Sequence, residues 1–255
     1  MGERTSHPPG TFSWTDLSTT DPDGARAFYS GLFGWDTADT PLPGGGVYTM
    51  LVKGGRYVAA LSAARDGHPP AWNSYVTVES ADAAAASAAE HGGTLAMEPF
   101  DVMDAGRMAL VQDPTGAFFA VWEPRDSIGA QLVNEPGTLT INQLNSSEPA
   151  RAQEFYEGVF GWRFESLPES DQRYWGIYNG DRLNAGMTEL QPDAGAPSHW
   201  LVYFGCESVN DDAGRIADLG GQVVVPPLPI PAGRILVAQD PQGAFFALFS
   251  GEFDD

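Results

Sequence analysis

Histidine and cysteine, the side chains most often used for metal or nucleophilic chemistry, are scarce in this chain. The only cysteine, Cys206, excludes an internal disulfide and a cysteine cluster for zinc or iron–sulfur, and it favours a reducing compartment. Of four histidines, His7 lies near the N-terminus, His68 in an expected loop and His91 at an expected helix end. Only His199, at the start of an expected strand, is placed to act as a base.

The composition excludes several classes of protein. The 255 residues include 13 Lys and Arg against 34 Asp and Glu, so the formal net charge of −21 disfavours nucleic acid and anionic membranes as partners. Because 42% of the residues are hydrophobic and only 18% are charged, a disordered chain and a coiled coil are both excluded. No signal-peptide pattern opens the sequence and no apolar run reaches the length of a membrane helix, so we expect a cytoplasmic protein.

The sequence repeats itself at a spacing of about 127 residues. Residues 28–35, which contain Phe-Tyr and Phe-Gly-Trp, recur at 155–162, and the Asp-Pro-x-Gly-Ala-Phe-Phe-Ala segment 113–120 recurs at 240–247. Each copy is about the size of a domain. We therefore expect a first copy over 8–123, a linker over 124–137 and a second copy over 138–251.

Each copy is expected to contain two βαβββ units. In the first unit, strand-forming residues span 11–18, and Asp21-Pro22 offers an N-cap followed by a proline suited to the first helical position. Ala25, Phe28 and Leu32 follow the spacing of one buried helical stripe. Further strands are expected around 35–37, 47–52, 57–62 and 72–78, a helix over 81–90, and strands around 94–97, 107–112 and 117–122.

These motifs resemble those of the vicinal oxygen chelate superfamily, which contains glyoxalases, bleomycin resistance proteins and extradiol dioxygenases. The resemblance is carried twice, by segment 21–35 (Asp…Phe-Tyr…Leu-Phe-Gly-Trp) and segment 92–116 (Gly-Gly…Gly-Arg…Asp-Pro-Thr-Gly), and it covers nearly the whole chain. It is strongest to the tandem glyoxalase-like proteins of actinobacteria. It implies an α+β fold, a tandem duplication of glyoxalase-like domains whose four βαβββ units form two curved mixed sheets. Each sheet would wrap around a cup that usually holds a divalent metal ion.

The positions that the resemblance assigns to metal ligands hold poor ligands in both copies. Such a site needs several His, Glu or Gln side chains that converge on one point. The strands around 57–62 and 183–187 also lack a carboxylate. The resemblance therefore implies cups without a metal and without a cofactor. The aligned residues are Trp14, Asn73 and Ala120 in the first copy and Ile141, Leu201 and Ala247 in the second.

Side chains alternate along a strand, so the residues two positions away from these should face the same cup. The resulting lining is aromatic and apolar with a few polar groups, which suits a flat hydrophobic ligand. Alternatively, the aromatic side chains fill each cup as core. The candidate ligand-binding residues are Phe12, Trp14, Asn73, Tyr75, Phe118, Ala120 and Trp122, and then Ile141, Gln143, Leu201, Tyr203, Phe245, Ala247 and Phe249.

Two residues are candidates for catalysis. Asp16 is the one carboxylate on the expected inward face of an opening strand, and its counterpart in the second copy is Gln143. Loss of solvent would raise the pKa of Asp16 and suit it to general acid or base chemistry, whereas a salt bridge or hydrogen bond at the strand end would be structural. His199 is likewise either a base or a solvent-exposed or hydrogen-bonded residue at a strand entry.

Three functions remain open. The first is metal-independent binding of a small aromatic or hydrophobic molecule, such as a polyketide-like compound, which the resemblance to drug-binding members implies. The second is an enzyme on the same scaffold, a lyase, isomerase or oxygenase (hydroxylase) acting on a reactive carbonyl or aromatic polyketide, with Asp16 or His199 as base. The third is a structural or interaction protein with filled cups. Because two copies are already fused, we expect a monomer with internal pseudo-symmetry rather than a homodimer.

Overall fold

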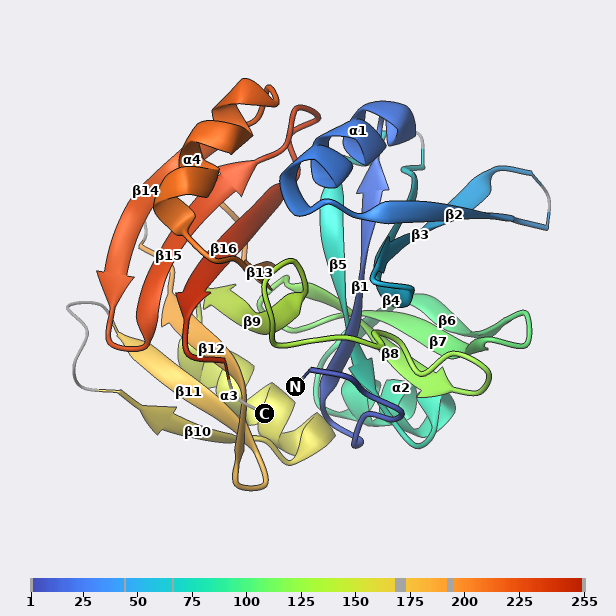
Figure 1. The fold of residues 1–255 in the computed structure, drawn as a ribbon. Coiled ribbons are helices and arrows are strands. Elements are labelled where there is room, and N and C mark those ends of the chain that lie inside the picture. The colour runs from blue at the N-terminus through green and yellow to red at the C-terminus, as the bar shows by residue number, and fades with distance from the viewer. Residues whose placement is uncertain (1, 44, 66, 168–172, 192–194, 254–255) are drawn as a thin grey trace.

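The computed structural model of the protein describes residues 2–43, 45–65, 67–167, 173–191 and 195–253. Across these ranges the chain forms two eight-stranded mixed sheets and four helices, which confirms the expected α+β duplication (Figure 1). The first copy contains β1 (Phe12–Thr19), α1 (Pro22–Phe33), β2 (Asp36–Pro41), β3 (Val47–Lys53), β4 (Arg56–Ala63), β5 (Ala71–Thr77), α2 (Ala81–Glu90), β6 (Thr94–Val102), β7 (Gly106–Gln112) and β8 (Phe118–Pro124).

The second copy repeats this order of elements. Its sheet has the strand order β10-β11-β12-β9-β13-β16-β15-β14, which matches β2-β3-β4-β1-β5-β8-β7-β6 of the first sheet strand for strand. In each sheet the opening strand runs parallel to one central neighbour and antiparallel to the other. The elements are β9 (Leu139–Ser146), α3 (Pro149–Phe160), β10 (Arg163–Ser166), β11 (Tyr174–Asn179), β12 (Arg182–Glu189), β13 (His199–Gly205), α4 (Val209–Asp218), β14 (Gln222–Ile230), β15 (Gly233–Gln239) and β16 (Phe245–Gly251).

Local sequence accounts for the ends of α1. The Asp21 side chain accepts a hydrogen bond from Gly24 N at 3.1 Å, and Pro22 occupies the first turn, where its missing N–H costs nothing. Gly34 ends the helix at φ 71°, a left-handed conformation that glycine adopts without strain. Gly161 ends α3 in the same conformation at φ 70°. The glycine of each repeated Phe-Gly-Trp motif is therefore a helix stop.

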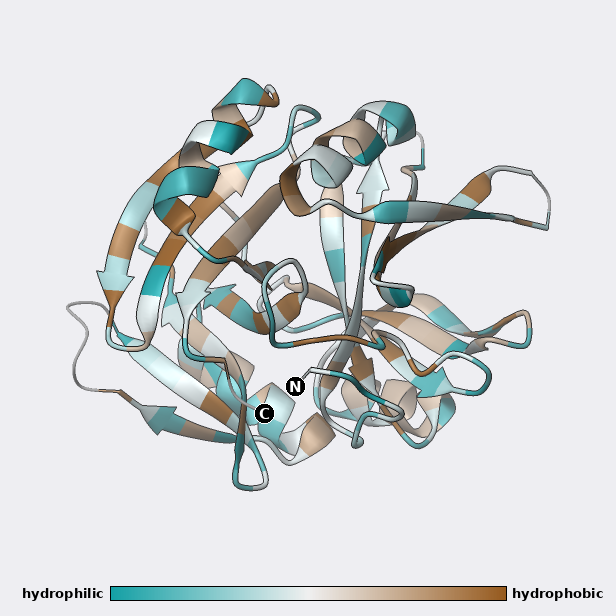
Figure 2. Cartoon of the chain, in the orientation of Figure 1, coloured by the Kyte–Doolittle hydropathy of each residue, from teal (hydrophilic) through white to brown (hydrophobic). Residues whose placement is uncertain are grey.

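The hydrophobic core does not divide along the sequence repeat. Leu32 of α1 belongs to one buried cluster with Ile216 of α4 and Phe204 of β13, so the first helix of copy one packs on the last unit of copy two. A second cluster joins Ala85 of α2 to Tyr156 of α3. Figure 1 shows α1 beside α4 at the top, and Figure 2 shows that both helices carry hydrophobic as well as hydrophilic residues. Each copy therefore completes its core with side chains of the other.

The tyrosine of each repeated Phe-Tyr pair connects the two copies through buried hydrogen bonds. The Tyr29 hydroxyl accepts from Trp72 Nε1 at 2.8 Å and donates to Asp240 Oδ2 of the second copy at 3.0 Å. Asp240 also accepts from Ala244 N in its own turn at 2.9 Å. The repeated motifs thus build the contact between the copies. The pseudo-symmetric set, with the same two distances, is Tyr156, Trp200 and Asp113.

In the described part of the chain, no helix covers the other face of each sheet, which is the cup side predicted from the sequence. In the first sheet it is marked by the buried cluster of Trp14, Tyr75 and Ala120, and we call this face cup 1. In the second sheet it is marked by Tyr203 and Ala247, and we call it cup 2. Neither cluster includes a helical residue. Any small-molecule site of the expected kind must therefore lie on these two faces.

Candidate functional site

Asp16 lies at the centre of cup 1 and is 7% exposed. Its Oδ2 accepts hydrogen bonds from the hydroxyls of Tyr75 at 2.8 Å and Tyr48 at 3.0 Å. Its Oδ1 accepts a hydrogen bond from Asn73 Nδ2 at 2.8 Å. Across the parallel pairing of β1 and β4 the neighbour of Asp16 is Ala60, which is fully buried. One acidic group is therefore held by three neutral donors.

Burial raises the pKa of Asp16 above its ordinary value, and the hydrogen bonds from Asn73, Tyr75 and Tyr48 oppose that rise. The pKa values of both tyrosines are raised well above 10, first by burial and then by the nearby Asp16 carboxylate. The tyrosines therefore remain protonated and act as donors. Asp16 is the group in this cluster that can lose its proton while both tyrosines keep theirs.

Tyr48 is a member of this cluster that the sequence-based list lacks. It lies on β3, opposite Ser62 of β4, and its hydroxyl accepts a hydrogen bond from Trp14 Nε1 at 3.0 Å while it donates to Asp16. The sequence-based list took no residue from the strand expected at 47–52, where Tyr48 and Met50 share one face of β3. Trp14 is thereby held at its indole nitrogen, next to the carboxyl group.

The structure overturns the placement of Phe12 in cup 1. The pairing of β1 with β5 shifts register between Phe12 and Trp14, so strict alternation fails at the start of the strand. Phe12 turns to the helix side, where its ring lies 4.8 Å from Trp200 and 5.6 Å from Trp162. It belongs to the core that joins the two copies.

The aligned ligand positions do not form a metal site. Trp14 lies opposite Tyr75, and Tyr75 is level with Ala120, so the three side chains that face one another at this level offer one phenol and no carboxylate or imidazole. Asn73, which the resemblance aligned with a ligand, is one level away, opposite Asp16. Within the ranges that the structure describes, no group of three or more His, Cys, Asp and Glu side chains could hold a metal ion. These residues do not fit the divalent ion that the resemblance associates with the fold.

Cup 1 is covered at one end, and we call the other end, where an aromatic ring is exposed, its open end. At the closed end, Ala130 of the linker donates its N–H to Ser13 O at 2.7 Å, and its carbonyl lies 2.7 Å from His7 Nε2 of the N-terminal segment. At the open end, Phe118 is 49% exposed although it shares a strand face with Ala120. The predicted cup residues Trp14, Tyr75, Ala120 and Trp122 are buried between these ends, and Asn73 is half-buried.

Cup 2 places a chain of neutral groups where cup 1 has its carboxyl group. The Tyr203 hydroxyl donates to Gln143 Oε1 at 3.2 Å, and Gln143 Nε2 donates to Asn145 Oδ1 at 2.9 Å. Asn145 Nδ2 lies 3.2 Å from His199 Nε2, and His199 Nδ1 lies 2.8 Å from the carbonyl of Pro197. His199 is thus part of a hydrogen-bond chain at the start of β13, and its role as a base stays a prediction.

A second tyrosine also faces Gln143. Tyr174 of β11 lies over Gly186, the β12 residue paired with Gln143, and a Cβ at Gly186 would collide with the Tyr174 hydroxyl. Burial raises the pKa of Tyr174 to about 12. The remaining predicted residues of cup 2 range from the buried Leu201 and Ala247 to the exposed Phe245, and they include the half-buried Ile141 and Phe249.

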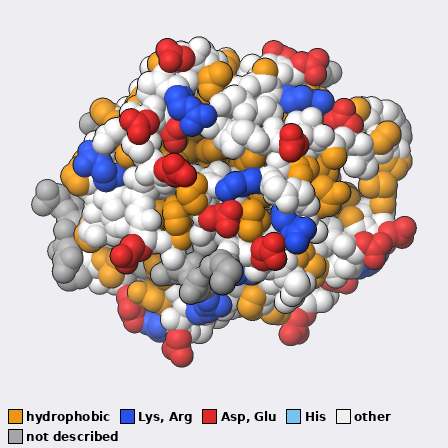
Figure 3. All heavy atoms as spheres, in the orientation of Figure 1, with side chains coloured by type: hydrophobic (Ala, Val, Ile, Leu, Met, Phe, Trp, Pro, Cys, Tyr) orange, Lys and Arg blue, Asp and Glu red, His pale blue; other side chains and the backbone are white. Residues whose placement is uncertain are grey.

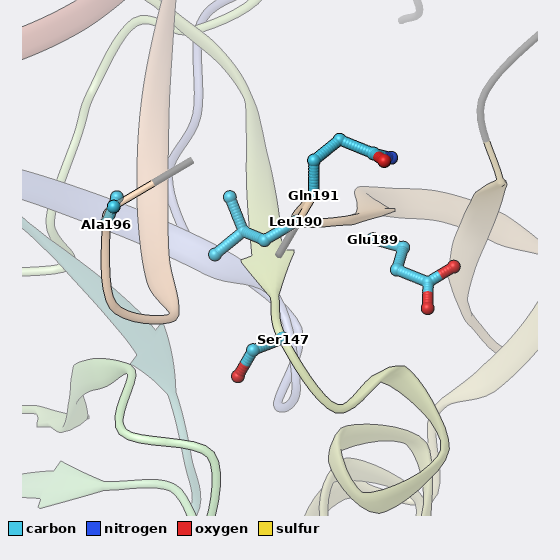
Figure 4. Close-up of a pocket in the computed structure, with 6 residues that line it drawn as sticks. Ser147, Glu189, Leu190, Gln191 and Ala196 are labelled. Atoms are coloured by element: carbon cyan, nitrogen blue, oxygen red, sulfur yellow. The ribbon is translucent and has the colours of Figure 1, made fainter. Parts of the chain in front are cut away.

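Two open hollows of about 460 Å³ each lie beside the ends of β9 and β12, away from both clusters. Figure 4 shows that the side chains of Ser147, Glu189 and Gln191 at the first hollow point in different directions, so they do not converge on one ligand atom. Glu189 borders both hollows. Neither hollow is lined by Asp16, Gln143 or His199. The hollows therefore contribute nothing to the candidate chemistry.

Other features of the described chain narrow its chemistry further. The Cys206 thiol is buried, and burial raises its pKa to about 12, so it is a poor nucleophile. Figure 3 shows acidic and basic side chains interspersed with hydrophobic ones on one face, without a single basic patch. Among the described helices, none is both long and apolar enough to cross a membrane.

Known proteins resemble this chain over nearly its full length. It is 42% identical over 255 residues to the Mycobacterium tuberculosis protein named "Putative glyoxylase CFP32", with 97% of each chain covered. It is 32% identical over 260 residues to the anthracycline biosynthesis protein DnrV of Streptomyces peucetius, covering 94% of this chain and 93% of that protein. The solved structure of the Mn(II)-bound glyoxalase from Novosphingobium aromaticivorans matches with a TM-score of 0.68 at 17% identity, covering 100% of this chain and 86% of the other.

The structural likeness at that identity concerns the fold alone, and the sequence comparisons carry the assignment. A sequence model of one family matches residues 11–121 and again residues 138–248, which are the two copies seen in the sequence and in the sheets. The resemblance drawn from the repeated motifs is thereby confirmed. The chain belongs to the Glyoxalase/Bleomycin resistance protein/Dioxygenase superfamily, with two tandem domains of that family.

Proposed function

We propose that the protein binds a small, flat aromatic or hydrophobic molecule on the open side of cup 1, without a metal ion. The observation that carries this proposal is the pairing of a polar anchor with an aromatic surface. Asp16, buried and held by Tyr48 and Tyr75, accepts a hydrogen bond from Asn73, and the ring of Phe118 is half-exposed at the open end. A few fixed polar groups within an apolar lining are typical of small-molecule sites.

The relatives are consistent with a ligand of this kind. The name of the Streptomyces peucetius relative refers to anthracycline biosynthesis, and anthracyclines are fused-ring aromatic compounds. A half-exposed phenylalanine offers such a ring a stacking surface. Burial of Trp14 and Trp122 favours the alternative that side chains fill the closed end of the cup. The proposal therefore concerns the open end, from Asp16 to Phe118.

The binding site can be tested with danthron, a neutral dihydroxyanthraquinone that absorbs light emitted by tryptophan. We expect saturable quenching of the protein fluorescence and a rise in melting temperature. Phe118→Ala should weaken the quenching without unfolding the protein, because the ring is half-exposed. If only Phe245→Ala, the equivalent change in cup 2, weakens binding, the assignment to cup 1 is wrong. Absence of saturable quenching and of a thermal shift would overturn the proposal.

A second candidate function is proton transfer at a carbon next to a carbonyl group, as in a lyase or isomerase. The raised pKa of Asp16 favours it, because a carboxylate of higher pKa is a stronger base and can both take and return a proton. In this step the C–H bond breaks, its proton passes to Asp16, and the electron pair moves to the carbonyl oxygen as an enolate. Tyr48 and Tyr75, no longer required by an ionised carboxylate, could then donate to that oxygen.

Hydrogen–deuterium exchange separates the enzyme from the binder. The ketone 2-tetralone, a flat bicyclic carbon acid, is incubated in D2O, and deuterium uptake at its α-carbon is followed by proton NMR. For an enzyme we expect faster uptake than in buffer, lost in Asp16→Asn while binding of 2-tetralone persists. Binding without faster uptake favours the binding protein. His199→Gln should leave uptake unchanged if Asp16 is the base.

A further inference from the structure

The Asp16 carboxyl group has no positive partner within the described chain. Its hydrogen-bond donors, Tyr48, Tyr75 and Asn73, are all neutral. None of the ion pairs formed between described residues includes Asp16, and no cation counteracts the effect of burial on its pKa. A carboxylate removed from water without a counter-charge is costly, and hydrogen bonds offset only part of that cost. When ionised, Asp16 therefore has no counter-charge among the described residues.

Hydrogen-bonding capacity remains on the same carboxyl group. Oδ2 accepts from two tyrosine hydroxyls, whereas Oδ1 accepts from one side chain, Asn73 Nδ2. A carboxylate oxygen can accept two hydrogen bonds. An N–H donor that approached from the side of Phe118 and Asn73 would therefore find an acceptor on Oδ1.

The second copy retains two facing tyrosines and lacks the charge. Gln143 takes the register position of Asp16, beside Gly186 where cup 1 has Ala60. Two tyrosines again face this position, Tyr203 through a hydrogen bond of 3.2 Å and Tyr174 over Gly186. The duplication therefore differs at this point by one negative charge and by two neighbours, since Leu201 and Ile141 take the positions of Asn73 and Trp14. Cup 2 is an uncharged counterpart of cup 1 and not a matched control for that charge.

We propose that cup 1 selects an amine, a flat aromatic or hydrophobic molecule whose protonated nitrogen binds Asp16, and that cup 2 has no such preference. This inference rests on the proposed binding function and names its ligand class. The ammonium group supplies the missing positive charge and donates to Oδ1, while the ring lies towards Phe118. The overall charge of −21 adds a long-range attraction for cations, which raises the rate of encounter without selecting the site.

A matched pair of probes tests the selection. The probes 1-naphthylmethylamine and 1-naphthalenemethanol share one ring system, and only the amine is charged at neutral pH. By isothermal titration at physiological ionic strength, we expect the wild-type protein to bind the amine about tenfold more tightly or better. Asp16→Asn should remove that preference. Asp23→Asn, which removes one exposed charge from the first turn of α1, should keep it.

A second measurement on the unaltered protein avoids any effect of substitution on folding. Affinity for the amine should fall on acidification as Asp16 becomes protonated, whereas affinity for the alcohol should stay level. The titratable groups that face Asp16 are Tyr48 from β3 and Tyr75 from β5, and neither loses its proton in this range because both pKa values are raised well above 10.

The possible outcomes distinguish amine selection from ligand binding itself. Equal affinities for the amine and the alcohol in the wild-type protein would overturn amine selection and leave the binding proposal standing. A preference for the amine that persists in Asp16→Asn and does not depend on pH would also overturn it, since the preference would then come from the general charge. If neither probe binds, the proposed function fails and the inference fails with it.

Discussion

Asp16 of β1 and Gln143 of β9 occupy the same register position in the two sheets, each paired with a small residue of the parallel strand beside it. The carboxyl group accepts three hydrogen bonds, while the amide both accepts and donates within a chain that ends at His199. The two copies have therefore kept one architecture and diverged at its chemical centre. Any function that depends on an acid belongs to cup 1.

The pH dependence of stability should report on Asp16. Burial raises the pKa of Asp16 in the folded protein, so its contribution to stability is full below the unfolded-state value of about 4 and is lost as the pH rises through the folded value. Asn cannot ionise. The free energy of unfolding of the wild type, minus that of Asp16→Asn, should therefore fall by up to about 1.4 kcal/mol per pH unit in that window.

Urea denaturation of both proteins over a pH series measures this difference. The other shifted groups, among them Asp240, are present in both proteins, so their contributions cancel in the subtraction. Parallel stability profiles for the wild type and Asp16→Asn would mean that Asp16 is not held at a raised pKa.

Removing the hydroxyl of a motif tyrosine should destabilise the contact between the copies. In Tyr29→Phe, Trp72 Nε1 loses its acceptor and Asp240 Oδ2 loses a donor, and both groups are buried. We expect a loss of about 1–3 kcal/mol in the free energy of unfolding. Tyr57→Phe, at a tyrosine that is 40% exposed, should change it by less than about 0.5 kcal/mol. Equal effects of the two variants would contradict the buried network.

Neither half of the chain should be a stable folded monomer. Expressed separately as residues 1–137 and 138–255, each half exposes the helix surface that it buries against the other in the intact protein. Loss of a shared core removes cooperative unfolding. Light scattering and thermal unfolding of the halves, alone and mixed, provide the measurement. A monomeric half with its own sharp melting transition would show that the cores are separable.

Chelation of metals should leave the protein unchanged. Because Trp14, Tyr75 and Ala120 face one another where ligands would be needed, purified protein should contain well below one nickel, zinc, manganese or iron ion per chain. EDTA should not alter the melting temperature, since no ion contributes to the folded state. A stoichiometric metal by mass spectrometry, together with a lower melting temperature after chelation, would contradict this reading of the donor set.

Much of the fold could be predicted from the sequence, because its signals are local and repeated. The cap at Asp21, the stop at Gly34 and the helix over 81–90 depend on residues adjacent in the chain, and the structure has them as expected. The strand expected around 94–97 continues to Val102 as part of an edge strand. Edge strands carry weaker sequence signals because only one side of the backbone is paired.

The candidate site could be predicted only in part, because alternation fails at a register shift and does not show which strands lie near one another. Asp16 was found because alternation holds along most of β1, and Phe12 was misplaced because a register shift interrupts that alternation. Tyr48 approaches Asp16 from a strand two places away in the sheet, so no local pattern connects them. The sharing of cores between the copies is equally invisible to periodicity, because a buried stripe does not say which copy covers it. The expected monomer and cytoplasmic location stay predictions.

A crystal structure of the protein with 1-naphthylmethylamine would show directly whether Asp16 of cup 1 binds the amine. We expect density for the naphthalene ring on the open side of cup 1, against Phe118, with the amine nitrogen about 3 Å from Asp16 Oδ1. Density only in the hollows beside Glu189, or elsewhere on the surface, with the side chains around Asp16 closed over an unoccupied face, would contradict it.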